Sequence, residues 1–179
     1  MILIFGPAGS GKSVQGQFLA ARYGWKWLSM GQLLRDTDDD KIHKIQAAGE
    51  LVPSYISSGI IDAAVKKAEN KYPQVVVDGF PRDEDQAIMS YEENNWKIDL
   101  AIVLDVPREE VLKRMMLRGR ADDTEDSMKE RLAIYHHNMA DIKKVLAKNG
   151  TKIVEVDGVG GYGQVHDRIA KVIAACKLA

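Results

Sequence analysis

Cysteine is almost missing from this chain: Cys176 stands alone among 179 residues. One thiol excludes an internal disulfide and a cysteine-based zinc site, and it fits a reducing compartment. We therefore expect no structural zinc and a cytoplasmic location.

Long apolar runs are also missing. A membrane span needs about 20 such residues, and the opening run 2–5 stops at Gly6-Pro7 without a basic leader. That run predicts a buried strand.

The chain also lacks an excess of positive charge, with Lys+Arg 25 against Asp+Glu 26 and a formal net charge of -1. Non-specific binding to nucleic acid or to a membrane surface requires a basic field, so we expect neither partner. Any anion site must be built locally. A chain of this length can remove about 70% of its unfolded surface from water in a single core. One domain over residues 1–179, as a monomer, is the expectation.

What is present is an alternation of short apolar runs and stretches with helical spacing. The runs lie at 2–5, 25–28, 75–77, 100–104 and 153–156, and the helical stretches at about 11–23, 55–70, 83–94, 108–118, 124–149 and 164–177. This alternation predicts a five-stranded parallel sheet covered on both faces, a three-layer α/β/α sandwich. Residues 31–72 hold two or three expected helices without a strand, which predicts a helical insertion.

The first strand leads into Gly6-Pro7-Ala8-Gly9-Ser10-Gly11-Lys12-Ser13, which matches the phosphate-binding P-loop pattern G-x-x-x-x-G-K-[ST]. Its glycines let backbone N–H groups surround a phosphate, and the following helix adds the positive end of its dipole. Lys12 would reach the β- and γ-phosphates, and the Ser13 hydroxyl would face Mg²⁺. A plain glycine-rich turn is the alternative, which the strand before and the helix after disfavour.

Asp78 follows the apolar residues 75–77 at the expected end of a strand. An aspartate in that position more often caps the next turn. Beside a P-loop, however, a carboxylate at the end of the neighbouring strand is typical of the residue that holds the Mg²⁺ shell. Ser13 and Asp78 are therefore the expected metal residues, partly through water.

Arginine is the cation that suits transfer between two phosphates, because its planar fork binds phosphate oxygens in pairs and stays charged. The candidates are Arg35, Arg82, Arg114, Arg118, Arg120 and Arg131. The alternative is a solvated basic face paired with acids such as Glu109 and Glu110. No general base is evident, which favours a phosphate acceptor, since its second pKa is about 6 and it needs no proton removed.

The ordered motifs resemble those of adenylate kinases and related nucleoside monophosphate kinases over nearly the whole chain. They are the P-loop with Gln15, residues 28–35, Gly49-Glu50-Leu51-Val52-Pro53, Asp78-Gly79-Phe80-Pro81-Arg82 with Gln86, and Gly119-Arg120-Ala121-Asp122-Asp123 followed by Arg131-Leu132. The resemblance implies a core with a P-loop fold, a monophosphate-binding segment at about 30–57 and a short LID at about 118–125.

The same resemblance implies roles for individual residues. ATP would be bound by Gly6, Ala8, Gly9, Ser10, Gly11, Lys12, Ser13, Val14 and Arg114, and AMP by Met30, Gly31, Arg35, Val52, Gly79, Arg82, Gln86, Arg120 and Arg131. Lys12, Arg82, Arg114, Arg118, Arg120 and Arg131 would be catalytic, and Asp122 with Asp123 would order the closed LID. The Gln86 amide can pair with the N1 and N6 edge of adenine, so AMP is the preferred acceptor.

Three departures from the family pattern affect details. Ser13-Val14 stands where relatives have Gly-Thr, Met30 and Gln32 replace the Thr and Asp of the acceptor motif, and residues 157–163 are unusually rich in glycine. The expected reaction is ATP + AMP = 2 ADP with Mg²⁺. The alternatives are a UMP/CMP or other monophosphate kinase, a non-catalytic nucleotide switch, or a small-molecule kinase acting on an alcohol.

Overall fold

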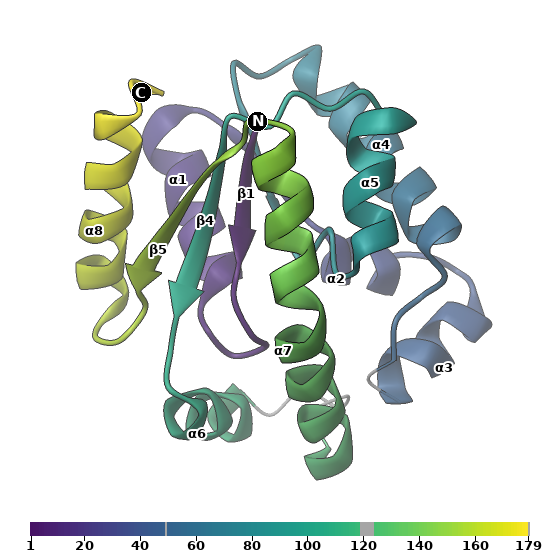
Figure 1. Ribbon diagram of the computed structural model, residues 1–179. Helices are drawn as coiled ribbons and strands as arrows, with labels where there is room; N and C mark the ends of the chain where they lie inside the picture. The colour runs from purple at the N-terminus through teal and green to yellow at the C-terminus, as the bar shows by residue number, and fades with distance from the viewer. Residues whose placement is uncertain (49, 119–123, 179) are drawn as a thin grey trace.

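The computed structural model describes residues 1–48, 50–118 and 124–178. Its strands are β1 (Ile2–Phe5), β2 (Lys26–Ser29), β3 (Val75–Asp78), β4 (Leu100–Asp105) and β5 (Lys152–Asp157). Its helices are α1 (Lys12–Tyr23), α2 (Met30–Arg35), α3 (Asp40–Ala48), α4 (Ser54–Glu69), α5 (Glu84–Glu92), α6 (Arg108–Arg118), α7 (Glu125–Lys148) and α8 (Tyr162–Ala175). Figure 1 shows the strands side by side with helices around them.

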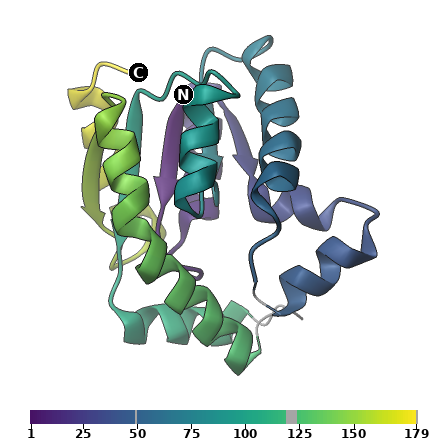
Figure 2. The same cartoon turned by 45° about the vertical axis from the view of Figure 1, so that its right-hand side comes forward.

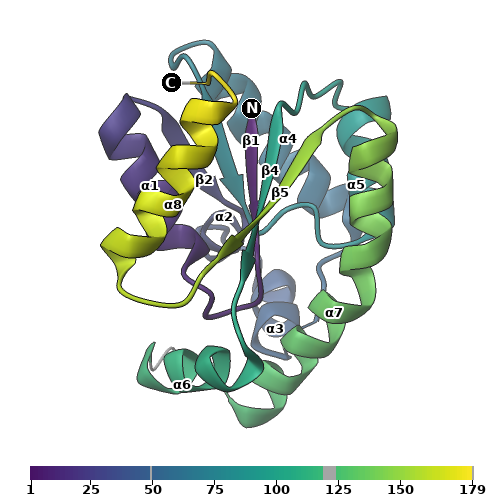
Figure 3. The same cartoon turned by 60° about the vertical axis from the view of Figure 1, so that its left-hand side comes forward.

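The five strands form one parallel sheet in the order β2-β3-β1-β4-β5. Seen nearly edge-on, α1 and α8 cover one face and α5 and α7 the other (Figure 3). The predicted three-layer α/β/α fold with a five-stranded parallel sheet is therefore confirmed. None of the helices in the described part of the chain is long and apolar enough to span a bilayer.

Two hydrophobic clusters lie on opposite faces of the sheet because side chains alternate along each strand. Leu3 and Val77 pack with α4, α5 and α7, whereas Ile2, Ile4 and Val76 pack with α1 and α8. All five side chains are fully buried. Strands buried on both faces must be apolar throughout, which is why the central strands could be predicted from short apolar runs in the sequence.

Between β2 and β3 the chain forms three helices instead of one crossover helix. Helices α2 and α3 precede α4, and α4 packs in the hydrophobic cluster of the sheet through Ile61 and Val65. Figure 2 shows α3 standing away from the sheet, opposite the end of α7 where that helix begins. The structure thus has the expected run of helices between residues 31 and 72, and places α3 beside the edge where the strands end.

Every strand ends at the same edge, since the sheet is parallel. The P-loop follows β1, which lies between β3 and β4, and the chain crosses to opposite sides of β1 in its successive connections. Ligands of open α/β sheets bind at such a switch point, outside the carboxyl ends of the strands. The fold therefore directs the P-loop, Ser29 and Asp78 toward one place.

Candidate active site

The P-loop between β1 and α1 has a backbone that only glycine accommodates well. Gly9 and Gly11 have φ angles of 85° and 97°. A Cβ atom on Gly9 would lie 2.7 Å from Met115 Cγ and 2.9 Å from the Val111 carbonyl oxygen. The loop is therefore wedged against α6, and any side chain at position 9 would push the two apart.

Lys12 is the first residue of α1, and its side chain folds back over the loop. The Nζ atom donates hydrogen bonds to the carbonyl oxygens of Gly6 at 2.7 Å and Pro7 at 2.8 Å. The backbone N–H of Ser10 donates to the Pro7 carbonyl at 3.1 Å, which closes the turn. The ammonium charge is thus held at the rim of the phosphate cradle.

A cavity of about 660 Å³ opens at this edge of the sheet. Thirteen of the predicted site residues line it: Ala8, Gly9, Gly11, Lys12, Ser13, Val14, Gly31, Arg35, Asp78, Gly79, Arg82, Arg114 and Arg131. These residues come from the P-loop, from α2, from the end of β3 and from α6 and α7. Segments distant in sequence therefore meet in one pocket whose volume suits small-molecule ligands.

Three guanidinium groups lie close enough in this cavity to influence one another. Burial lowers the pKa of Arg82, the Asp78 carboxylate raises it, and the charges of Arg131 and Arg35 lower it further. Arg82 Nε donates to the Gly79 carbonyl oxygen at 2.7 Å, which fixes its direction. Like charges held close together are the expected signature of a site built for a polyanion.

Arg114 connects the P-loop with the loop that follows β5. Its Nη1 atom donates to the carbonyl oxygens of Ser10 at 3.3 Å and Gly158 at 3.1 Å. Its Nε atom donates to Glu110 Oε1 at 2.7 Å, one helical turn away on α6. Arg114 thus holds α6 against the P-loop and the loop that follows β5 at one wall of the cavity.

Asp78 ends β3 and is almost completely buried, with 3% of its surface exposed. One carboxylate oxygen accepts a hydrogen bond from Trp27 Nε1 at 2.7 Å, and the other from Ser29 Oγ at 3.1 Å. Both donors come from β2, next to β3 in the sheet. The carboxylate is therefore held in one orientation at the floor of the cavity.

Five predicted site residues support the cavity without lining it in this structure: Gly6, Ser10, Met30, Val52 and Gln86. Met30 and Val52 are core residues with 1% and 4% of their surface exposed. Gln86 is equally buried, and its Oε1 atom accepts the backbone N–H of Arg82 at 2.9 Å. It therefore braces the turn that carries Arg82, and its role in reading the acceptor base stays a prediction.

The remaining predicted residues lie outside the part of the chain that the structure describes. They are Arg120, Asp122, Asp123 and the side chain of Arg118. Their assignments to the LID and to the phosphate clamp stay predictions.

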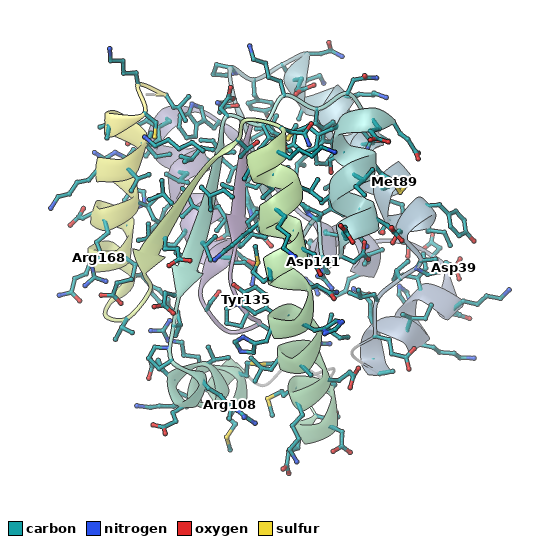
Figure 4. All side chains as sticks on the ribbon, in the orientation of Figure 1. Asp39, Met89, Arg108, Tyr135, Asp141 and Arg168 are labelled. Atoms are coloured by element: carbon teal, nitrogen blue, oxygen red, sulfur yellow. The ribbon has the colours of Figure 1, made fainter. Side chains whose placement is uncertain are left out.

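Two tyrosines that were not predicted from the sequence also line the cavity. Tyr135 lines it from α7 (Figure 4), and burial raises the pKa of its phenol to about 12, with Asp105 and Glu155 contributing. Tyr162, at the start of α8, lines it with 61% of its surface exposed. An exposed tyrosine after a glycine run was the available signal for the second residue, while Tyr135 resembles any apolar residue of a long helix.

Gln46 joins the two sides of the site. Its backbone carbonyl accepts a hydrogen bond from Arg131 Nη2 at 2.9 Å, and its side-chain amide donates to the Gly31 carbonyl at 3.3 Å. The residue thus links α7 with α2 by way of α3. No sequence motif marks Gln46, because a glutamine on an exposed helix is ordinary.

A phosphate loop on a five-stranded parallel sheet, facing a cluster of arginines, defines a P-loop phosphotransferase. The family model described as "Adenylate kinase" matches residues 4–151 of the chain. The chain therefore belongs to the adenylate kinase family. The assignment agrees with the site, since both the P-loop and the arginines fall within the matched range.

Curated relatives resemble the chain along almost its full length. The adenylate kinases of Nocardia farcinica and Mycobacteroides abscessus are each 32% identical to it, over 96% of this chain and 98% of theirs. The adenylate kinase of Maricaulis maris is also 32% identical, over 96% of this chain and 97% of its own. The predicted family is thus confirmed, and nothing in these comparisons favours a different class of kinase.

Proposed function

We propose that this protein transfers the terminal phosphoryl group of ATP to AMP, yielding two molecules of ADP. One observation carries the proposal: Lys12, Arg35, Arg82, Arg114 and Arg131 line a single cavity next to the P-loop. Two polyanions repel each other when they approach to bonding distance. Fixed positive charge placed before they arrive offsets that repulsion without reorganisation of the protein.

The cavity has two ends that suit two nucleotides. On one side the P-loop and Arg114 would hold the triphosphate donor, with the base near the loop that follows β5. On the other side Arg35 and Arg82 would bind the acceptor phosphate, beneath α2. Arg131, on α7, also lines the cavity and would contact the transferring group between them, and it donates a hydrogen bond to the Gln46 carbonyl oxygen. Positioning and charge stabilisation then suffice, because a phosphate acceptor is already ionised at neutral pH.

Adenylate kinases act on magnesium-bound nucleotide, and the residues at this site fit that ion. Mg²⁺ prefers oxygen ligands and binds through one or two carboxylates together with phosphates and water. Asp78 and Ser13 both line the cavity, and the Asp78 carboxylate uses only part of its acceptor capacity on Trp27 and Ser29. The ion would neutralise charge on the phosphates. Asp78 and Ser13 would orient its oxygen shell.

Two segments of the chain would complete the site around the nucleotides. Residues 30–57, containing α2 and α3, would bind the monophosphate, and residues 118–125 would form the LID. The hydrogen bond between Arg131 and Gln46 supports the first assignment, because it places the helical segment against an arginine of the transfer site. Monomeric state and cytoplasmic location stay predictions, testable by gel filtration and cell fractionation.

A coupled assay with purified protein, ATP and Mg²⁺ tests the reaction. The acceptors AMP, CMP, UMP, GMP and dTMP are compared at equal concentration, and AMP should give the highest kcat/KM. Preference for CMP or UMP would assign the protein to the pyrimidine branch of the family. Nucleotide binding without turnover of any acceptor would refute the proposal and leave a nucleotide switch.

A further inference from the structure

We propose that Trp27 is a positioning residue, which holds the Asp78 carboxylate in the orientation that receives magnesium-bound nucleotide. The inference rests on the function proposed above and adds a residue to it. Trp27 does not line the cavity, so it acts through Asp78 and not on the substrate. Its indole nitrogen lies 2.7 Å from Asp78 Oδ2.

The register of the sheet explains why a tryptophan at position 27 reaches this carboxylate. Ser29 is paired with Asp78 across β2 and β3, and Trp27 is paired with Val76. Residues two apart on a strand share a face, and Val76 packs in the cluster beneath α1. Trp27, Ser29 and Asp78 therefore project toward α1, where the long indole can extend past one residue pair to the carboxylate.

Helix α1 confines the indole from the other side. Gly16, on the second turn of this helix, has no side chain, and a Cβ atom there would lie 2.6 Å from Trp27 Nε1 and closer still to Cδ1. The ring is therefore packed directly against the backbone of the helix that begins at Lys12. This packing fixes the position of the indole ring and directs its N–H bond toward Asp78 Oδ2.

The two hydrogen-bond donors from β2 leave part of the acceptor capacity of the Asp78 carboxylate unused. The Trp27 indole and the Ser29 hydroxyl each donate to a different oxygen, and an ionised carboxylate offers about four acceptor sites. The acceptor sites that these donors do not use would meet the ion, because Asp78 itself lines the cavity. Groups that orient a metal-binding carboxylate in this way typically contribute about 10- to 100-fold in metal affinity or activity.

The matched experiment uses two single substitutions of the same kind. Trp27→Phe keeps a ring against Gly16 and removes the N–H donor. Trp96→Phe is the control, because Trp96 Nε1 also donates to a carboxylate, Asp62 Oδ1 at 3.0 Å, outside the cavity. Calorimetry measures ADP affinity with and without Mg²⁺. The ratio of the two affinities isolates the contribution of the ion.

We expect Trp27→Phe to raise the Mg²⁺ concentration for half-maximal enhancement of ADP binding by about 10-fold. Affinity for ADP without the ion and KM for AMP should change less than about 2-fold, because Trp27 does not line the cavity. Trp96→Phe should leave all three quantities unchanged. An unchanged Mg²⁺ dependence in Trp27→Phe, or an equal loss in both variants, would overturn the positioning role.

A third variant separates this inference from the proposed reaction. If Asp78→Asn retains the full Mg²⁺ dependence, Asp78 is not the metal residue and the role of Trp27 is refuted with it. If Trp27→Phe loses the Mg²⁺ dependence in a protein that does not turn over ATP with AMP, the positioning role stands and the reaction is wrong.

A measurement on the unaltered protein covers the case in which Trp27→Phe does not fold. The chain has three tryptophans, so its indole N–H groups give three assignable NMR signals. The Trp27 signal should shift on adding Mg²⁺ to the ADP complex, while those of Trp25 and Trp96 stay in place. Identical Trp27 signals with and without the ion would overturn the inference.

Discussion

Replacing Arg82 by Met should remove activity while leaving the fold nearly as stable as before. Burial and the charges of Arg35 and Arg131 all disfavour the charged Arg82 in the folded protein, and Asp78 only partly offsets them. A neutral side chain of similar length relieves that penalty. It also loses the hydrogen bond to the Gly79 carbonyl oxygen, so the two effects on stability oppose each other.

The effect on catalysis has no such compensation. A hydrogen bond to a charged group contributes about 1.5–3 kcal/mol, and a guanidinium fork can make two with one phosphate. Loss of both should lower kcat/KM by at least about 100-fold, at about 1.4 kcal/mol for each factor of ten. Tm should stay within about 4 °C of the parent, which corresponds to roughly 1 kcal/mol for a chain of this size.

The assay couples ADP production from ATP and AMP to a spectroscopic signal, and calorimetry gives Tm. Arg82→Lys should recover part of the activity, because one charge returns without the fork. Arg22→Met is the control, since Arg22 is exposed, lies over the Tyr23 ring and does not line the cavity. A variant Arg82→Met that keeps more than about a tenth of the activity would refute the reasoning. If Arg82→Met loses Tm along with activity, the role of Arg82 is to stabilise the fold and not to bind phosphate.

Three further predictions concern the lining of the cavity and a residue that supports it. Gly9→Ala should lower the free energy of unfolding by about 2–5 kcal/mol, because an alanine there has a positive φ and overpacks against α6. Gly59→Ala is the control: its methyl group meets no atom within 4 Å and should raise the free energy of unfolding by about 0.5–1 kcal/mol. Urea unfolding measures both, and equal effects would contradict the packing argument. Tyr162→Ala should raise KM for ATP at least about 5-fold and leave KM for AMP unchanged, because stacking on a base contributes about 1–3 kcal/mol; unchanged KM values would exclude the ring from the donor site. Gln86→Glu keeps the acceptor for the Arg82 backbone N–H but loses the amide donors, so it should weaken the preference for AMP over CMP by about 1–3 kcal/mol. If Gln86→Glu keeps this preference and Gln86→Ala loses it, Gln86 braces the turn and does not read the base.

The parts of the fold that the sequence predicted are those in which a local pattern decides the structure. Strands buried on both faces must be apolar, and the P-loop needs its glycines in order. The second strand was predicted at 25–28 and lies at Lys26–Ser29. Trp25 precedes it and stacks on Tyr23 in the core. An aromatic residue can satisfy its need for burial in a turn as well as in a strand, so apolar character alone does not mark the boundary.

The site was less predictable where burial depends on partners far along the chain. Met30 and Val52 pack in the core, because neighbouring helices cover them, and their contact with the acceptor stays a prediction. The contact between Trp27 and Asp78 joins residues 51 positions apart, and only the sheet register creates it. The roles of residues 118–125 depend on a segment whose middle lies outside the described residues.

Arg114 ties the first loop of the chain to one near its end, through the carbonyl groups of Ser10 and Gly158. During synthesis on a ribosome, the glycine loop emerges long before Gly158 and Tyr162. A nascent chain therefore carries an incomplete donor wall until these residues have been translated. Competence to bind ATP should consequently appear only after residue 158 has been added, and a chain truncated before it should lack that competence.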